Sequence, residues 1–366
     1  MTGIPRLEVT FRIITPTFLA GADQAKAEMR ATALKGLLRY WFRALTPEHV
    51  QGRKSPEAML FGSHWNRIGQ SRIHLMLEEK EPVYYSVSKS EEIQESALYH
   101  PHPGNQDWAY LDPDQTFTVS IYLRPNQKGT ELEQTWKGVL ASLWLMMQVG
   151  GIGSQSRRGF GTVQIERWEP VGNWPSQMME MIYRFNEVQP ESPQAYKNQW
   201  QKQWDLIRSW FRPRVGSHSS PYTLIGPSFQ TYFSKQTFEA YDHAWEQANA
   251  LIQKVKEDGR YAFGLPVVEG RYTMFPEKNS IFKRQVASPV RIRIPRLSTK
   301  KYLLQFSFLS APYPQKIFKG KKVQISRGKY VKTIYQGESF PLDAPKYWKG
   351  LESILKKDFL QAGDGA

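Results

Sequence analysis

The chain opens with an alternation of apolar and polar side chains, with apolar residues at every second position from 7 to 13. This is the period of a strand that buries one face. From residue 29 to 45 the apolar residues recur at helical spacing and form one stripe. The stripe contains Leu34, Leu37, Leu38, Trp41, Phe42 and Leu45. The pattern predicts a strand followed by an amphipathic helix.

Four further elements complete the first half of the chain. Strand-like runs lie at 72–77 and 116–123, a second apolar helix pattern covers 131–149, and a strand pattern covers 162–168. The predicted order is therefore strand, helix, strand, strand, helix, strand. This is the split βαβ order of ferredoxin-like or RRM-like domains, in which helices pack on one face of an antiparallel sheet. We predict the α+β class.

The second half repeats these elements less regularly. Strand patterns lie near 222–229, 286–294 and 302–309, helix patterns at 236–256 and 346–358, and a short basic hairpin precedes the last helix. We predict tandem ferredoxin-like domains. The predicted division is an N-terminal domain at 1–170, a helical connector at 171–215 and a degenerate C-terminal copy at 216–366.

The positive charge is concentrated in one segment. The 366 residues carry 49 Lys and Arg against 34 Asp and Glu, a net charge of +15, and residues 278–337 hold 15 basic residues and no acidic one. Apolar residues interleave with these charges, so we predict a folded sheet with a basic face. A surface of this kind favours a polyanionic partner.

The chain has no cysteine, which excludes disulfides, thiolate nucleophiles and thiolate-bound metal sites. No apolar run reaches the length of a membrane span, and the first residues lack the continuous apolar core of a signal peptide. We expect a soluble, cytoplasmic protein.

A glycine-rich stretch, residues 150–161, contains five glycines between a predicted helix and a predicted strand. Nucleotide-binding loops run in the opposite order, from strand to helix, because the amides at the start of the helix hold the phosphate. We therefore predict no nucleotide site here. Because so many of its residues lack a side chain, this backbone is suited to lie close against a sugar-phosphate chain, with Arg157 and Arg158 at the tip of the loop.

Candidate catalytic residues do not form a recognisable arrangement. His100 and His102, with Asp107 nearby, lack the second motif of a metal site, so we predict a surface loop and neither a metal nor another cofactor. A metal-independent ribonuclease needs a general base beside an acid or a cation. His64 and His100 are the leading candidates for that base.

Several blocks in the chain resemble the RAMP (repeat-associated mysterious protein) subunits of CRISPR effectors. They are ITPTFLAGADQ at 14–24, EMR at 28–30, LKGLLRYWFRAL at 34–45, LFGS at 60–63, the glycine-rich stretch, and ASPVRIR at 287–293. Within that superfamily the blocks are most similar to the first subunit of the type III-B Cmr complex. One departure is Ala20-Gly21, where family members usually have Gly-Gly.

The resemblance implies tandem ferredoxin-like domains and a subunit without catalytic residues of its own, because target cutting in such complexes is assigned to a different RAMP subunit. We expect a non-catalytic RNA-binding subunit of an RNA-guided antiviral Cmr complex. It would bind single-stranded guide or target RNA at one end of the assembly and contact other Cmr subunits. Two alternatives stay open, namely a metal-independent endoribonuclease of the guide-processing RAMP type and a purely structural subunit.

Basic residues at regular spacing define the expected RNA contacts. Lys35, Arg39 and Arg43 recur at every fourth position on a stripe beside the apolar one. Arg291 and Arg293 are two residues apart, so we predict that both lie on an exposed strand face opposite an apolar one. In loops, Trp65 and Trp108 are candidates for stacking on bases. The predicted RNA-binding residues are Arg30, Lys35, Arg39, Arg43, Gly153, Arg157, Arg158, Arg291 and Arg293, and no residue is predicted to be catalytic.

Overall fold

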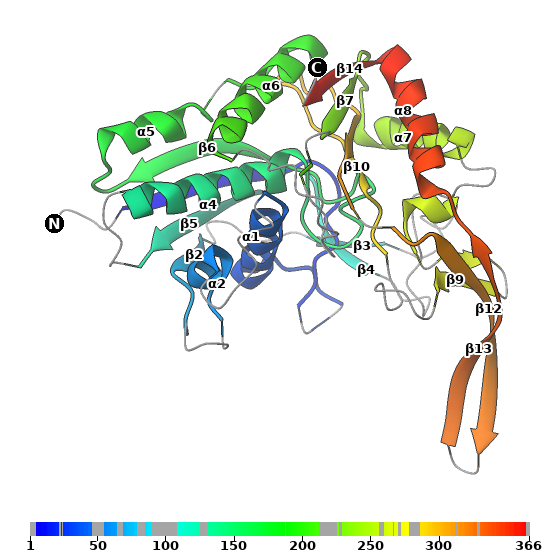
Figure 1. Cartoon of the computed structure of the whole chain (residues 1–366). Coiled ribbons are helices and arrows are strands. Elements are labelled where there is room, and N and C mark those ends of the chain that lie inside the picture. Colours follow the sequence, from blue (N-terminus) through cyan, green and yellow to red (C-terminus); the bar gives the residue numbers. More distant parts are fainter. Residues whose placement is uncertain are drawn as a thin grey trace.

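The described residues form three four-stranded antiparallel sheets, and two of these share one topology and organise the chain (Figure 1). The computed structural model describes residues 5–21, 23, 25–45, 55–63, 69–78, 85–88, 108–124, 130–186, 188–211, 225–226, 229–255, 260–265, 267–269, 272–277, 286–311, 313–327 and 330–363.

The first sheet has the strand order β2-β5-β1-β6. Its helices α1 and α4 follow β1 and β5, which is the ferredoxin-like arrangement predicted from the element order. Helix α2 and the hairpin β3-β4 are short insertions into this arrangement, between β1 and β5. The bounds are β1 (Arg6–Ile13), α1 (Ala31–Leu45), α2 (Pro56–Phe61), β2 (Ile73–Glu78), β3 (Tyr85–Ser88), β4 (Trp108–Leu111), β5 (Thr116–Leu123), α4 (Thr130–Gln148) and β6 (Val163–Val171).

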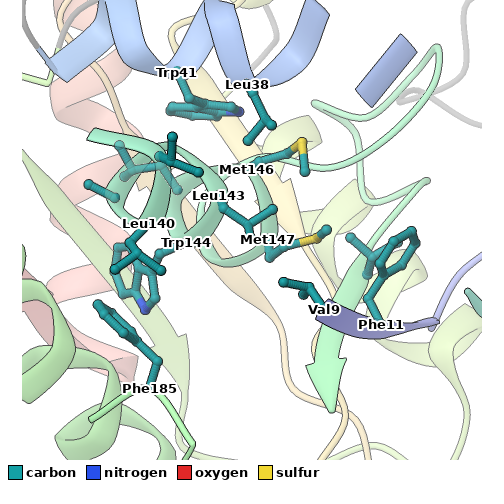
Figure 2. Packing of buried hydrophobic residues seen from close by; sticks show 14 of the residues in the cluster. Val9, Phe11, Leu38, Trp41, Leu140, Leu143, Trp144, Met146, Met147 and Phe185 are labelled. Carbon is teal, nitrogen blue, oxygen red and sulfur yellow. The ribbon is translucent and has the colours of Figure 1, made fainter. Parts of the chain in front are cut away.

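Helix α4 forms the centre of the first core. Strand β1 buries every second residue, as its sequence pattern predicts, and turns that side toward the helices. Figure 2 shows Leu38 of α1 beside Met146 of α4, and Val9 and Phe11 of β1 beside Met147. The apolar stripe of α1 therefore packs as expected and leaves its charged stripe at the surface.

The second sheet repeats the same topology, with the order β10-β11-β7-β14. Helices α7 and α8 pack on one face of it, and the connector helix α6 packs on the other, where Trp200 contacts Phe233 of β7. The predicted tandem fold is confirmed. The bounds are α5 (Ser176–Tyr183), α6 (Pro193–Trp210), β7 (Gln230–Ser234), α7 (Tyr241–Val255), β10 (Val290–Arg293), β11 (Gln305–Phe308), α8 (Ala344–Asp358) and β14 (Phe359–Gly363).

A third sheet, in the order β13-β12-β9-β8, is inserted into the second unit. Its hairpin β12-β13 was predicted to be short, but each strand has twelve residues. The bounds are η3, a 3-10 turn (Arg260–Phe263), β8 (Val267–Glu269), β9 (Tyr272–Pro276), β12 (Lys316–Arg327) and β13 (Tyr330–Pro341). The proposed division of the chain at residues 170 and 215 stays a prediction. Among the helices formed by described residues, none has the length and apolar character needed to cross a bilayer.

Candidate nucleic-acid interface

An open groove lies along the charged stripe of α1. Lys35, Arg39 and Arg43 line it together with His74 of β2 and Arg124, which follows β5, and its volume is about 1030 Å³. The register of the sheet creates this site, because β2 pairs with β5 and the Arg124 amide donates to the carbonyl oxygen of Arg72. Five basic side chains from three separate parts of the chain thus share one open surface, which we call the α1 groove.

A buried carboxylate holds two of these cations in place. Glu57, at the start of α2, is only 3% exposed. Its Oε1 atom accepts a hydrogen bond from the Arg39 Nε atom and lies 2.7 Å from an Arg43 guanidinium nitrogen. Because this carboxylate offsets part of the charge of both arginines, Lys35 and Arg124 carry much of the remaining positive potential.

The environment of Lys35 disfavours its charged form. Burial lowers the pKa of Lys35, and the neighbouring positive charges of Arg124 and Arg39 lower it further. An anion bound in the α1 groove would reverse this repulsion. The electrostatics of the groove therefore favour the binding of a negatively charged group.

Arg293 does not lie on an exposed face, so that prediction is wrong. Its side chain is 1% exposed. Its guanidinium donates to the carbonyl oxygens of Gln148 and Val163, at 2.9 and 2.8 Å, and to the Gln305 side chain at 2.9 Å. The two-residue spacing correctly placed Arg291 and Arg293 on one side of β10. That side is covered, because the end of α4 and the start of β6 pack on it.

Arg291 is also buried, at 4% exposure. Its guanidinium lies over the ring of Trp41 at 4.7 Å and the ring of Tyr40 at 5.3 Å, and it donates to the Tyr40 hydroxyl at 2.8 Å. Burial lowers the pKa of Arg291 to about 10, and the charge of Arg157 contributes in the same direction. The predicted exposed position is wrong for Arg291 as well. Its guanidinium nevertheless contacts α1, through Tyr40 and Trp41.

The glycine-rich stretch joins the two ferredoxin-like units. Toward the first unit, the Ser154 amide donates to the carbonyl oxygen of Phe18. Toward the second unit, the Gly159 amide donates to the carbonyl oxygen of Ile292 in β10, and the Ile292 amide donates to that of Arg157. Gly153 has a φ of +85°, and a Cβ atom there would lie 2.4 Å from the Phe18 carbonyl oxygen. Packing within the protein therefore requires a glycine here, and the RNA contact at Gly153 stays a prediction.

Arg157, Arg158 and Arg291 form a group that we call the arginine cluster. Burial, together with the charge of Arg157, lowers the pKa of Arg158 to about 10. The Arg157 Nε atom is buried and has no hydrogen-bond partner among the residues that the structure describes. Besides burial, the neighbouring side chains that shift the pKa of Arg158 and Arg291 belong to arginines and tyrosines, not to acidic residues. An anion at this cluster would supply the missing negative charge.

The exposed arc of α1 connects the α1 groove with the arginine cluster. Arg39 and Tyr40 are consecutive residues, so their side chains leave the helix about 100° apart. Arg39 lines the groove, whereas Tyr40 contacts Arg291. Gly36 is exposed on the arc between them, and a Cβ atom there would meet no other atom within 4 Å. The surface between the two basic regions is therefore low and open.

The remaining predicted residues have varied positions. Arg30, just before α1, is exposed and donates to the Ala20 carbonyl oxygen at 2.9 Å. His64, His100 and Trp65 lie outside the described residues, and Trp108 belongs to β4. In the part of the chain that the structure describes, no three His, Asp or Glu side chains gather as a metal site would require.

Sequence reasoning missed two residues of the α1 groove, His74 and Arg124. His74 lies in the predicted strand 72–77, and Arg124 directly follows the predicted strand 116–123. In the ferredoxin-like order these two strands are neighbours. Combining the predicted topology with the charges at the strand ends would have found both residues.

Comparisons with known proteins agree with this architecture. Residues 10–164 match the family model described as the RAMP superfamily. Over 180 residues the chain is 26% identical to the CRISPR system Cmr subunit Cmr1-2 of Pyrococcus furiosus. The matched region covers 42% of this chain and 91% of that protein.

Two solved structures have the same fold. The crystal structure of Cmr1 from Pyrococcus furiosus, apo form, matches with a TM-score of 0.54 and 18% identity over 98% of this chain and 99% of that one. A chain of the type III-B Cmr-beta complex bound to cognate target RNA matches with a TM-score of 0.57 and 13% identity, over 84% of this chain and 95% of that one. The resemblance identified from the sequence blocks is confirmed.

Proposed function

We propose, from the place of residues 10–164 in the RAMP superfamily, that the chain is a non-catalytic RNA-binding subunit of a type III-B Cmr complex. It binds single-stranded guide or target RNA at one end of the assembly and contacts other Cmr subunits. Similarity to a chain from a Cmr complex bound to target RNA supports this assignment. The observation that carries the proposal is the α1 groove, an open surface with five basic side chains.

The geometry supports contact with phosphates rather than recognition of bases. Residues four apart on a helix are neighbours on one face, about 6 Å apart, which is near the phosphate spacing of an extended single strand. Lys35 and Arg124 supply charge in the groove, and the arginine cluster supplies it on the other side of the exposed arc. A strand that crosses α1 would contact both regions through its backbone, with little dependence on sequence.

Replacing Lys35 and Arg124 by Ala is expected to weaken binding of unstructured single-stranded RNA by roughly tenfold. The slope of log K against log salt should fall by about 1.4, because each lost phosphate contact removes about 0.7 from the slope for a single strand. Fluorescence anisotropy with a labelled oligouridylate across a salt series measures both quantities.

The matched control is the double variant Arg167→Ala and Lys301→Ala, which removes the same residue types from other surface positions. Their side chains are 64% and 45% exposed, and each pairs with a glutamate. The control should bind RNA as the unaltered protein does. Equal affinity and slope for the groove variant and the control would contradict the assignment of the α1 groove.

The protein is expected to leave RNA intact. Labelled repeat RNA incubated with it in EDTA should be recovered at full length, because the proposed contacts hold phosphates without activating the 2′-hydroxyl. His74 lies in the α1 groove with Lys35 and Arg124, so His74→Ala is the variant to compare. Cleavage that survives chelation and disappears in His74→Ala would replace this proposal with the ribonuclease alternative.

A further inference from the structure

The hairpin β12-β13 extends beyond the sheet that supports it. The two strands pair with each other at twelve positions, from Lys316 opposite Pro341 to Arg327 opposite Tyr330. Strand β9 supports only the base, because it pairs with Ile317–Lys321. From residue 322 onward, β13 is the one described strand that pairs with β12, over about 20 Å at 3.3 Å per residue. Figure 1 shows this ribbon projecting from the body, away from α1. We call residues 316–341 the arm.

The arm carries charge of one sign. Residues 316–337 contain six lysines, one arginine and no acidic residue. At its base, Glu338 lies opposite Lys319 in the register, and the Lys319 ammonium lies 4.8 Å from the centre of the Tyr272 ring. Lys321, two positions further along, is exposed. The unbalanced charge therefore begins where the support of β9 ends.

Two opposed glycines mark the point where the arm leaves the sheet. Gly320 and Gly337 are direct partners in the register. A Cβ atom on Gly337 would lie 1.8 Å from the Lys319 carbonyl oxygen, so the strands approach each other too closely for any side chain here. A glycine pair of this kind is typical of a bend in a two-stranded ribbon.

The intrinsic stability of the arm is low. A two-stranded ribbon without a third strand is marginally stable in water, and the sequence at 316–337 adds seven positive charges with no acidic residue to balance them. Both costs fall when an anionic polymer lies along the ribbon. Lysine is depleted at the centres of protein–protein interfaces, where tryptophan, tyrosine and arginine dominate. Lysine is also a mobile point charge, which suits contact with a flexible phosphate chain better than shaped recognition.

We infer that the arm is a second RNA-binding element, which lies along the phosphate backbone of RNA that continues past the body of the protein. This inference rests on the proposed function. It adds a contact surface remote from α1 and from the glycine-rich stretch. A strand long enough to reach both the α1 groove and the arm would bind more tightly than a short one, since the two contacts are linked through one molecule.

The test uses the full chain and two labelled oligouridylates. One has about 10 nucleotides, within the span that a single binding groove covers, and the other has about 30. The arm variant is K321Q/K322Q/R327Q/K332Q. The control is K346Q/K349Q/K356Q/K357Q on α8, where all four lysines are exposed. Both variants lose four positive charges, so they match in net charge.

We expect the arm variant to bind the long RNA about tenfold more weakly than the control does, with a shallower salt slope, and to bind the short RNA equally well. The variant K321R/K322R/K332R keeps the charges and should bind like the unaltered protein. Thermal melting followed by circular dichroism checks that each variant folds.

Equal binding of the long RNA by the arm variant and the control would overturn this inference, and loss of co-elution with other Cmr subunits in that case would assign the arm to a protein contact. Absence of RNA binding by the unaltered protein would instead overturn the proposed function. If RNA binding weakens in the Lys35 and Arg124 variant but not in the arm variant, the result supports the proposed function and contradicts the RNA-binding role of the arm.

Discussion

Replacing Arg293 by Met should lower the free energy of unfolding by about 3 kcal/mol. Three buried acceptors lose their charged donor, although the Gln148 carbonyl oxygen still accepts from the Gln305 side-chain amide at 2.7 Å. Each acceptor that is left unsatisfied costs about 1–3 kcal/mol, partly offset because a buried charge is also removed. One acceptor is the carbonyl oxygen of Gln148 at the end of α4, where a positive charge is favourable. Methionine fills most of the space of the arginine stem. Urea unfolding measures the change through the transition midpoint at constant m-value.

The control for this prediction is Arg167→Met, which removes an arginine whose side chain is 64% exposed and forms a surface ion pair with Glu169 at 2.9 Å. Surface pairs contribute about 0–1 kcal/mol, so the midpoint should barely move. A loss below about 0.5 kcal/mol in Arg293→Met would show that the hydrogen bonds between the two units are energetically neutral.

The first ferredoxin-like unit could be predicted closely because its signals are local. The strand predicted at 116–123 coincides with β5, and the helix predicted at 131–149 is α4 within one residue at each end. These segments have unbroken periodicity and bury one clear face. The second unit was harder to place, since the strand predicted near 222–229 is β7 at Gln230–Ser234. Its sheet is covered on both faces, which weakens alternation as a signal.

The site could be predicted in part. The helical spacing of Lys35, Arg39 and Arg43 placed them together, because side chains four apart on a helix share a face wherever the helix packs. The environment of Arg291 and Arg293 depends on residues more than 100 positions away, such as Gln148 and Val163. No pattern in the sequence around β10 indicates that residues so distant will bury these two side chains. The ion pairs of Glu57 depend likewise on how α2 packs against α1.

Replacing Arg157 and Arg158 by Ala should weaken RNA binding by about 30-fold, the largest effect on binding that we expect. Both side chains are half-buried in the arginine cluster, where less solvent screens their charge, so the hydrogen bonds that these guanidinium groups donate to phosphate oxygens should be stronger than in the α1 groove. The salt slope should fall by about 1.4 for two lost contacts. Anisotropy with the oligouridylate of the groove experiment measures both values.

The same double variant should keep its melting temperature or raise it. Burial and mutual repulsion disfavour the charged form of Arg158, as its lowered pKa indicates, so removing the charges relieves a cost. The contacts that join the loop to β10 use backbone atoms, including the Arg157 carbonyl oxygen, which accepts from the Ile292 amide, and Ala retains them. Arg157→Lys with Arg158→Lys should restore most of the salt slope, because the slope depends on charge and not on guanidinium shape. A fall in melting temperature together with weaker binding would instead assign the two arginines to the junction between the units and leave the α1 groove as the RNA contact.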